Sequence, residues 1–236
     1  MTQAKPLQGL LLVDKPAGWT SFDAVNYIRK IAAAAEGKKP KQIKVGHAGT
    51  LDPFATGLLL VLVGKDYTRR AGELVKLDKT YEVTMRLGAV SSTGDPEGEI
   101  TSVSGVEPNE KALRDVLGRF TGSIRQVPPA YSAIKVGGQR AYKLARAGKE
   151  VKIEPRDVTV NRLEFLDYTY PQVKFVADVS SGTYIRSLVE DIGRALGSGA
   201  YTEALRRTRI DRYSVAGAAA PKDISVSNIL TALKTV

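Results

Sequence analysis

Cysteine is absent from this chain of 236 residues, and histidine occurs once, as His47. Without cysteine there is no disulfide, thiol nucleophile, iron–sulfur cluster or thiolate zinc site. A metal site would have to be built from carboxylates, and the sequence has no run of alternating Asp and Asn with a terminal Glu, the pattern of an EF-hand loop. The composition therefore predicts chemistry without a metal or a cofactor, carried by Asp, Glu, Tyr, Lys or Ser.

Long apolar runs are missing as well, since no segment approaches the roughly 18 apolar residues of a membrane span. The start, MTQAKPLQGLLLVDKP, has a short apolar segment without a small-residue cleavage site, so it predicts a first strand and not a signal peptide. Hydrophobic residues make up 43% of the chain and charged residues 25%, which is typical of a globular protein. We expect a cytoplasmic protein with no membrane partner.

Acidic residues are fewer than basic ones, 25 against 35, which gives a net charge of +10. The basic residues gather at Lys38, Lys39, Lys41 and Lys44, between Lys135 and Lys152, and at Arg206, Arg207, Arg209 and Arg212. A solvated basic surface and a nucleic-acid surface explain this excess about equally well. The charge alone therefore favours a polyanionic partner without establishing one.

Strand and helix patterns are mixed along the chain without strict βαβ order. The expected strands are 10–13, 58–63, 79–87, 158–165 and 173–179, and helices are expected from Thr20 or Ser21, from Asn109, over 184–196 and from about Ser227. This mixture predicts an α+β fold with a mainly antiparallel mixed sheet flanked by helices. The length and the lack of a long linker predict one domain.

The first expected helix should bury one face. Phe22, Val25, Ile28 and Ile31 recur every third residue and so form one apolar stripe, the pattern of a helix face that packs inward.

The segment from Gln126 to Lys152 interrupts the rhythm of strands and helices. It contains Pro128-Pro129, a Gly137-Gly138 turn and a short basic helix around 140–147. Against the single acid Glu150 it carries Lys135, Arg140, Lys143, Arg146, Lys149 and Lys152. This pattern predicts a protruding hairpin-and-helix insertion whose surface faces a polyanion.

The segment KVGHAGTLDPFATGLLL, from Lys44 to Leu60, holds a candidate catalytic acid, Asp52. Its glycines permit unusual backbone conformations, and Pro53 stiffens the chain after the acid. An Asp-Pro pair by itself most often caps a turn or a helix start, by roughly three to one. In a glycine-rich loop of a basic chain without metal ligands, a nucleophilic carboxylate becomes the better interpretation. His47 fits a structural role, with phosphate contact as the alternative.

Two other segments have patterns that can belong to ligand-binding sites. Val63-Gly64-Lys65 is not a phosphate loop, because Leu59 and Asp66 stand where the motif needs Gly and Ser or Thr. In contrast, Ser180–Arg186 follows a strand and opens a helix, so Arg186 could pair with a carboxylate and keep it ionised. A surface arginine on the first helical turn explains the same pattern equally well.

Together these segments resemble the TruB family of tRNA pseudouridine synthases from Leu10 to Arg212. Five stretches match in order: LLVDKPAGWTS at 11–21, GHAGTLDPFATG at 46–57, KTY at 79–81, VPPAYSAIKVGGQRAY at 127–142 and SGTYIRSLVEDIG at 181–193. The resemblance implies the pseudouridine synthase fold as one catalytic domain over 1–236, with a thumb insertion at about 127–152. Many members also carry a PUA-type RNA-binding domain, and we expect no full one here, because about two dozen residues follow Arg212.

The resemblance also implies roles for individual residues. Asp52 would be the nucleophile, Tyr81 the aromatic side chain against the flipped uracil, and Arg186 the ionic partner of Asp52. Tyr184 would line the pocket, and Leu205 would pack near it. The remaining implied RNA contacts are His47, which would hold the rearranged RNA loop, and Lys143 and Arg146 of the thumb. The family often has a Thr-Asp-Thr-like stretch where this chain reads SSTGD over 91–95, so Asp95 is given no role.

The implied function is conversion of uridine 55 in the T arm of tRNA to pseudouridine on a flipped-out base, with no cofactor or metal and no obligate protein partner. The carboxylate could attack C1′, form a glycal or add to C6. Two alternatives stay open. One is a synthase of the guide-RNA type, and the other is an RNA-binding or tRNA-folding protein with incidental activity.

Overall fold

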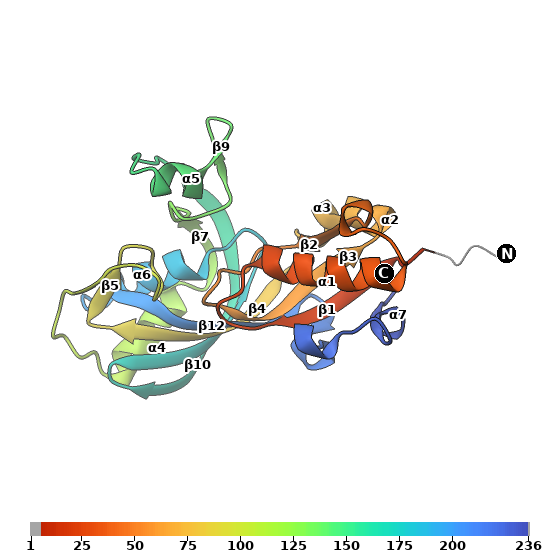
Figure 1. Ribbon diagram of the computed structural model, residues 1–236. Helices are drawn as coiled ribbons and strands as arrows, with labels where there is room; N and C mark the ends of the chain where they lie inside the picture. The colour runs from red at the N-terminus through yellow and green to blue at the C-terminus, as the bar shows by residue number, and fades with distance from the viewer. Residues whose placement is uncertain (1–5, 236) are drawn as a thin grey trace. The chain divides into compact units, whose positions relative to one another are not determined.

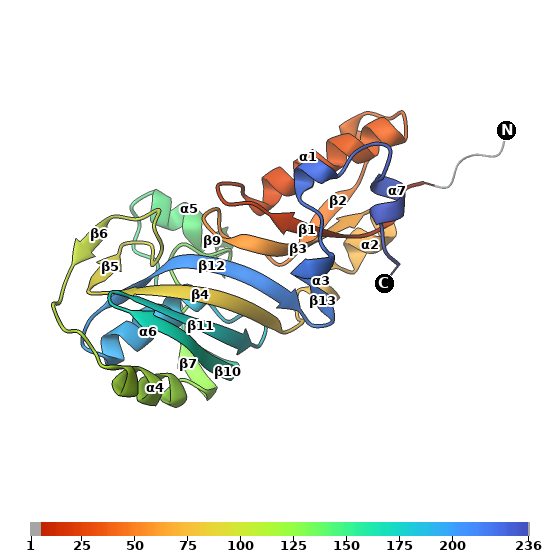
Figure 2. The same cartoon turned by 90° about the horizontal axis from the view of Figure 1, so that it is seen from below.

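The structure is a computed structural model that describes residues 6–235. Its contacts divide the chain into two compact units. Unit 1 contains the described residues up to Lys79 and those from Arg206 onward, and unit 2 contains Thr80–Leu205. Figures 1 and 2 label the elements of both units. Mainly antiparallel strands with helices packed on them confirm the predicted α+β class, whereas the single catalytic domain stays a prediction.

The sheet of unit 1 is centred on β3 (Thr56–Val63). Both β1 (Gly9–Lys15) and β2 (Val45–Ala48) pair with it in antiparallel register. Strand β12 (Ala200–Ile210) passes from unit 2 into unit 1, where Arg206 and Arg207 pair with the start of β3 in parallel register. The short β13 (Tyr213–Ser214) pairs with the end of β12.

Both faces of this sheet are covered, which explains the unbroken apolar run in β3. On one face, Leu59 and Val61 pack with α1 (Ser21–Ala35) and α7 (Ile229–Ala232). On the other face, Leu58, Leu60 and Leu62 pack with α3 (Ala71–Leu74) and Ile210. The remaining short helices of unit 1 are η1 (Pro40–Gln42), α2 (Lys65–Arg69), η2 (Val215–Gly217) and η3 (Pro221–Asp223).

The apolar stripe expected on the first helix is partly wrong. Val25 and Ile28 are buried in the core, but the Phe22 side chain is 61% exposed. The reason is geometric: at 3.6 residues per turn, each step of three falls about 60° short of a full turn. The buried face of α1 follows instead Ala24, Val25, Ile28 and Ala32.

The sheet of unit 2 has the strand order β12-β4-β11-β10-β7. Its strands are β4 (Lys79–Leu87), β7 (Gly122–Gln126), β10 (Arg156–Thr169) and β11 (Gln172–Val179), besides the first part of β12. Val173, Phe175, Ala177 and Val179 alternate inward as the sequence predicted. Helix α4 (Glu110–Arg119), capped by Asn109, contacts both β10 and α6 (Ile185–Ala195).

Two small hairpins complete unit 2. The first joins β5 (Ala89–Ser91) to β6 (Ile100–Ser102). The second joins β8 (Lys135–Val136) to β9 (Gln139–Arg140) and leads into α5 (Ala141–Arg146). Both turn glycines, Gly137 and Gly138, have positive φ, as a two-residue hairpin requires. The predicted hairpin and short basic helix are thus confirmed, and Figure 1 shows them standing off the sheet of their unit. We call residues 127–152 the thumb.

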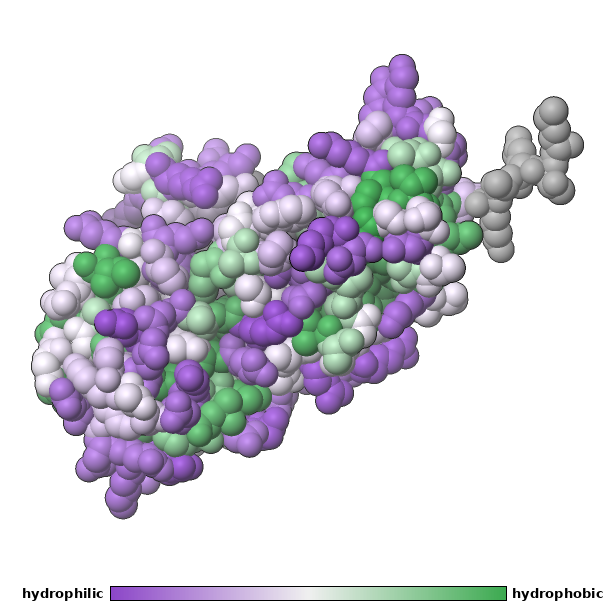
Figure 3. All heavy atoms as spheres, turned by 60° about the horizontal axis from the view of Figure 1, so that its bottom comes forward, coloured by the Kyte–Doolittle hydropathy of each residue, from purple (hydrophilic) through white to green (hydrophobic). Residues whose placement is uncertain are grey.

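The surface view in Figure 3 is mostly hydrophilic, with separate hydrophobic patches. Among residues 6–235, no helix is long and apolar enough to cross a membrane.

Candidate active site

The loop between β2 and β3 carries Asp52, as the sequence predicted. Asp52 is half-buried, and its carbonyl oxygen accepts a hydrogen bond from the Ala55 amide (3.2 Å), which closes a turn. His47 lies on β2 opposite Val61 of β3 and is also half-buried. One short segment of unit 1 therefore positions both side chains.

The residue before the acid is held by the first turn of α1. The buried Ser21 hydroxyl donates to the Leu51 carbonyl oxygen (3.2 Å) and accepts from the Leu51 amide (2.9 Å). Helix α1 itself starts at a capping box between Thr20 and Asp23. The backbone just before Asp52 is thereby tied to a helix end with little freedom.

The residue after the acid is held by a buried lysine. The Lys15 ammonium, fully buried, donates to the carbonyl oxygens of Pro16 (2.9 Å), Trp19 (2.7 Å) and Pro53 (3.3 Å). The Gly18 amide donates to the same Pro53 oxygen (2.8 Å). These bonds satisfy a charge that would otherwise be costly to bury, and they fix Pro53.

A buried arginine holds the two sides of the loop. The Arg207 guanidinium donates to the carbonyl oxygens of Leu58 (2.8 Å), Thr50 (3.2 Å) and Gly49 (3.1 Å). Arg207 is 1% exposed, so its assignment to a basic surface was wrong. The strands approach so closely that a Cβ at Gly57 would lie 2.3 Å from the Arg207 carbonyl oxygen, which restricts this position to glycine.

Arg206, the neighbour of Arg207 in the chain, forms an ion pair within unit 1. The Arg206 guanidinium forms a bidentate ion pair with the Asp14 carboxylate, with N–O distances of 3.0 and 2.7 Å. The predicted basic cluster at 206–212 therefore includes two arginines bound to groups within unit 1.

Lys79 packs beside this loop. A Cβ at Gly49 would lie 3.6 Å from the Lys79 Cε atom. The Lys79 ammonium donates to the carbonyl oxygens of Val75 (3.0 Å) and Leu77. Burial, and then repulsion from Arg207, lower the pKa of Lys79 to about 8. Near this pH the lysine beside the loop can lose its charge.

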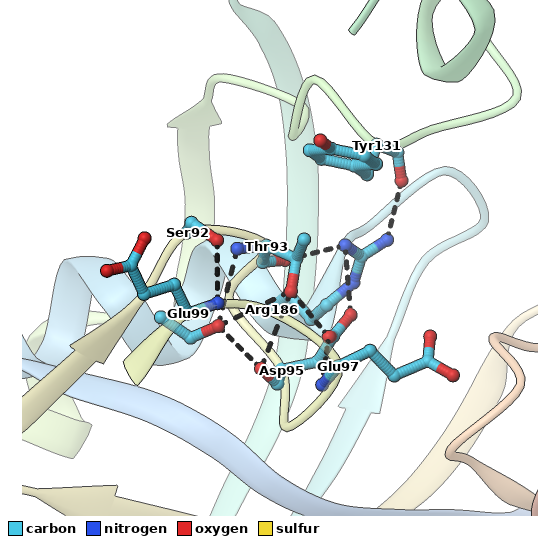
Figure 4. A network of polar contacts seen from close by, with 8 residues as sticks. Ser92, Thr93, Asp95, Glu97, Glu99, Tyr131 and Arg186 are labelled. Atoms are coloured by element: carbon cyan, nitrogen blue, oxygen red, sulfur yellow. Dashed lines mark hydrogen bonds and ion pairs between the residues drawn. The ribbon is translucent and has the colours of Figure 1, made fainter. Parts of the chain in front are cut away.

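In unit 2, Arg186 is buried at the start of α6 and tightly held. Its guanidinium donates to the carbonyl oxygens of Thr93 (2.8 Å) and Tyr131 (2.8 Å), and it lies 3.4 Å from an Asp95 carboxylate oxygen. Figure 4 shows these bonds converging from the loop after β5 and from the thumb. The surface alternative for Arg186 is therefore wrong, since the residue is 3% exposed.

Asp95, which had no role in the sequence analysis, is one of the residues that the sequence did not identify. It is 3% exposed. Its carboxylate also accepts from the Thr93 hydroxyl (2.6 Å) and the Glu97 amide (3.0 Å), and its carbonyl oxygen accepts from Ser91 (2.5 Å). The one sequence signal is the Thr-x-Asp-x-Glu spacing of an Asx-type turn.

The start of α6 is joined to the start of the thumb. The buried Gln126 side chain accepts from the Tyr184 amide (2.8 Å) and donates to the Tyr184 carbonyl oxygen (3.1 Å). The Ser187 hydroxyl donates to the Val127 carbonyl oxygen (2.8 Å). Tyr184 is half-buried at this junction, beside Arg186 in the chain.

The other predicted site residues are also in unit 2. Tyr81 on β4 and Leu205 on β12 are buried, with exposed fractions of 7% and 8%. Lys143 and Arg146 are exposed on α5, and the Arg146 guanidinium carbon lies 5.8 Å from the Tyr142 ring centroid. The thumb helix thus offers two exposed cations to solvent.

The units divide the predicted site between them. Asp52 and His47 lie on one segment of unit 1, β2 and the loop after it, whereas Arg186, Tyr184 and the thumb are joined by hydrogen bonds in unit 2. The pairing of Arg186 with Asp52 stays a prediction. Among residues 6–235, no group of three or more His, Asp or Glu side chains could hold a metal ion.

Two solved structures have a fold similar to that of this chain. The chain is similar, at 29% identity and a TM-score of 0.73, to a chain in the crystal structure of a Cbf5-Nop10-Gar1 complex, covering 96% of this chain and 60% of that one. A chain of an H/ACA RNP bound to a substrate RNA containing 2′-deoxyuridine gives a TM-score of 0.66, at 29% identity, over 93% of this chain and 52% of that one.

Family comparisons define the chain more closely. The family model described as TruB family pseudouridylate synthase (N terminal domain) matches residues 37–185, and that of the tRNA pseudouridylate synthase B C-terminal domain matches 186–231. The chain belongs to the TruB family of pseudouridylate synthases.

Two curated relatives are named tRNA pseudouridine synthase B. That of Dechloromonas aromatica (strain RCB) is 45% identical over 203 residues, which is 86% of this chain and 65% of the relative. That of Bordetella pertussis is 44% identical over 214 residues, which is 89% of this chain and 83% of the relative. The chain therefore spans only about two thirds of the first relative.

Proposed function

We propose that this chain isomerises uridine 55 in the T arm of tRNA to pseudouridine, with Asp52 as the nucleophile. The observation that carries the proposal is the backbone around Asp52. Ser21 holds Leu51, Lys15 holds Pro53, and Arg207 holds Gly49 and Thr50. These bonds fix the backbone on both sides of Asp52, which restricts where its carboxylate can lie and so favours attack.

The reaction needs no redox step. The N1–C1′ bond of uridine breaks, the base turns, and a C5–C1′ bond forms; the C5 proton leaves and N1 takes up a proton. Attack at C1′, formation of a glycal and addition to C6 all begin with an ionised Asp52. We propose that Arg186 keeps this carboxylate ionised. Its own fixed position, through Asp95, Thr93 and Tyr131, supports that role.

The target uridine must leave its stack, which costs a few kcal/mol. We assign Tyr81 to the flipped uracil, Tyr184 and Leu205 to the pocket around it, and His47 to the rearranged RNA loop. Lys143 and Arg146 would contact backbone phosphates. An aromatic contact and phosphate contacts together can offset the cost of flipping.

The guide-RNA alternative rests on the likeness to the chain in the Cbf5-Nop10-Gar1 complex, at 29% identity. The 45% identity to a tRNA pseudouridine synthase B favours tRNA as the substrate. We propose the T-stem loop as the partner and no obligate protein partner.

The experiment is to incubate the chain alone with unmodified tRNA and map pseudouridine by carbodiimide labelling and primer extension. We expect one new stop, one nucleotide 3′ of position 55, without added protein, guide RNA or metal. A stop elsewhere would contradict the assigned position. RNA binding without any stop would favour the RNA-binding alternative.

A further inference from the structure

Phe22 is an exposed aromatic side chain close in the fold to the Asp52 loop. It is 61% exposed on the first turn of α1, among the few large hydrophobic residues on the described surface. Its neighbour Ser21 forms the two hydrogen bonds that hold Leu51, the residue before Asp52. The exposed ring is therefore one residue away from a contact that fixes the candidate active-site loop.

The backbone that carries the ring is rigid. The Thr20 amide donates to the Asp23 carboxylate (2.8 Å), and the Asp23 amide donates to the Thr20 hydroxyl (3.1 Å). These bonds form the capping box that starts α1, and Phe22 lies between them in the chain. A ring on such a fixed turn loses little backbone freedom when a ligand binds it.

An arginine flanks the ring and connects it to β2. The Arg29 guanidinium carbon lies 5.9 Å from the Phe22 ring centroid. The same guanidinium bonds to the Asn26 side chain and donates to the Val45 carbonyl oxygen (3.1 Å). Val45 begins β2, two residues before His47. The ring and the cation are thus held from both α1 and the strand that carries His47.

We propose that Phe22 and Arg29 form a stacking site for an unpaired nucleobase next to the target uridine. The inference rests on the proposed function. When one base leaves its stack, a neighbouring base also loses a stacking surface, and an aromatic ring can replace it for any base. Arg29 adds positive charge beside the ring, and the exposed Lys44 directly precedes Val45. This charge favours a nucleotide over an uncharged apolar partner.

The test measures binding of a T-arm RNA in the Asp52→Asn background, so that turnover does not intervene. Phe22→Ala should weaken binding on the order of tenfold, the usual effect of removing one base-stacking ring. Phe22→Trp should restore it, and Phe22→Leu, apolar without a ring, should not. The matched control is Leu230→Ala, since Leu230 is 69% exposed on α7 of the same unit; it should bind as the parent does.

In the Asp52-containing enzyme, Phe22→Ala should raise KM and leave kcat unchanged, because stacking acts equally before and during the reaction. RNAs with an abasic site at one position beside the target should identify the stacked nucleotide. When the missing base is the one that stacks on Phe22, the parent and Phe22→Ala should bind that RNA equally. Parent-like binding by Phe22→Ala or Phe22→Leu would overturn the stacking site. If the wild type forms no pseudouridine, the proposed function fails instead, so the two failures are distinguishable.

Discussion

At the scale of single residues, buried cations organise the candidate site of unit 1. Lys15 and Arg207 are almost fully buried, and their N–H groups donate to backbone carbonyl oxygens of the Asp52 loop. Buried charge is tolerated only when such bonds replace water. The charge of these residues therefore serves the shape of the loop and is not available to RNA.

Lys79 should make the stability of the protein depend on pH. Its pKa of about 8 in the folded state lies below the ordinary value of 10.5, so the unfolded state binds more protons between these values. The free energy of unfolding should then rise with pH across this range. Urea unfolding measures this free energy at pH 7.5 and at pH 9.5. Its increase between the two pH values should be about 1 kcal/mol larger for the wild type than for Lys79→Met. Equal rises would contradict the lowered pKa.

Asp95 should matter for activity through Arg186. Asp95→Asn keeps the shape of the side chain but removes the negative charge 3.4 Å from the guanidinium. We expect the single-turnover rate to fall about ten- to a hundredfold, because the ion pair that helps to orient Arg186 is lost. Glu99→Gln, on an exposed residue of the same segment, is the control. A folded Asp95→Asn variant with the wild-type rate would exclude this positioning role.

Asp52 could be proposed from the sequence because glycines, proline and an isolated acid are local signals. It did not identify Asp95, Gln126 or the burial of Arg207. Their roles depend on which residues the fold brings to them over long sequence distances, such as Tyr184 for Gln126 and Gly49 for Arg207. Such partners leave no local pattern.

At the scale of elements, strands with a regular alternation were predictable and β12 was not. In β12 the inward positions include Thr202 and Arg207, so polar residues interrupt the expected alternation. Helix α1 was predicted, but its buried face was misjudged because a three-residue repeat drifts around a helix. Strand β11 was predictable because four apolar residues alternate along it without interruption.

The thumb should bind RNA through charge. Replacing Lys143 and Arg146 with Ala should weaken T-arm RNA binding and reduce the slope of log K against log salt by roughly 0.7 per lost phosphate contact. The matched control replaces Lys111 and Arg114 on α4, because their charges pair with Asp115 and Glu110 one turn away. The measurement is a salt titration of binding, and an unchanged slope in the thumb variant would contradict the role.

At the scale of the whole molecule, the family stretches recognised in the sequence coincide with the contacts that hold the site. LLVDKPAGWTS supplies Lys15 and Ser21, and SGTYIRSLVEDIG supplies Tyr184 and Arg186. The stretch KTY contains Lys79 and Tyr81. The class of fold and the family were therefore predictable, because ordered motifs identify a family before any contact is known. The hydrogen bonds that join one motif to another could be found only from the structure.

The proposed function depends most on Asp52 as the nucleophile. The most direct measurement is single-turnover tritium release from T-arm RNA labelled at C5 of uridine 55, comparing the wild type with Asp52→Asn and with the control Asp66→Asn. Asp66 is an exposed residue of α2, so Asp66→Asn makes the same chemical change away from the candidate site. We predict that Asp52→Asn loses at least about a thousandfold in rate while Asp66→Asn keeps the wild-type rate. Wild-type release by Asp52→Asn would contradict the central claim.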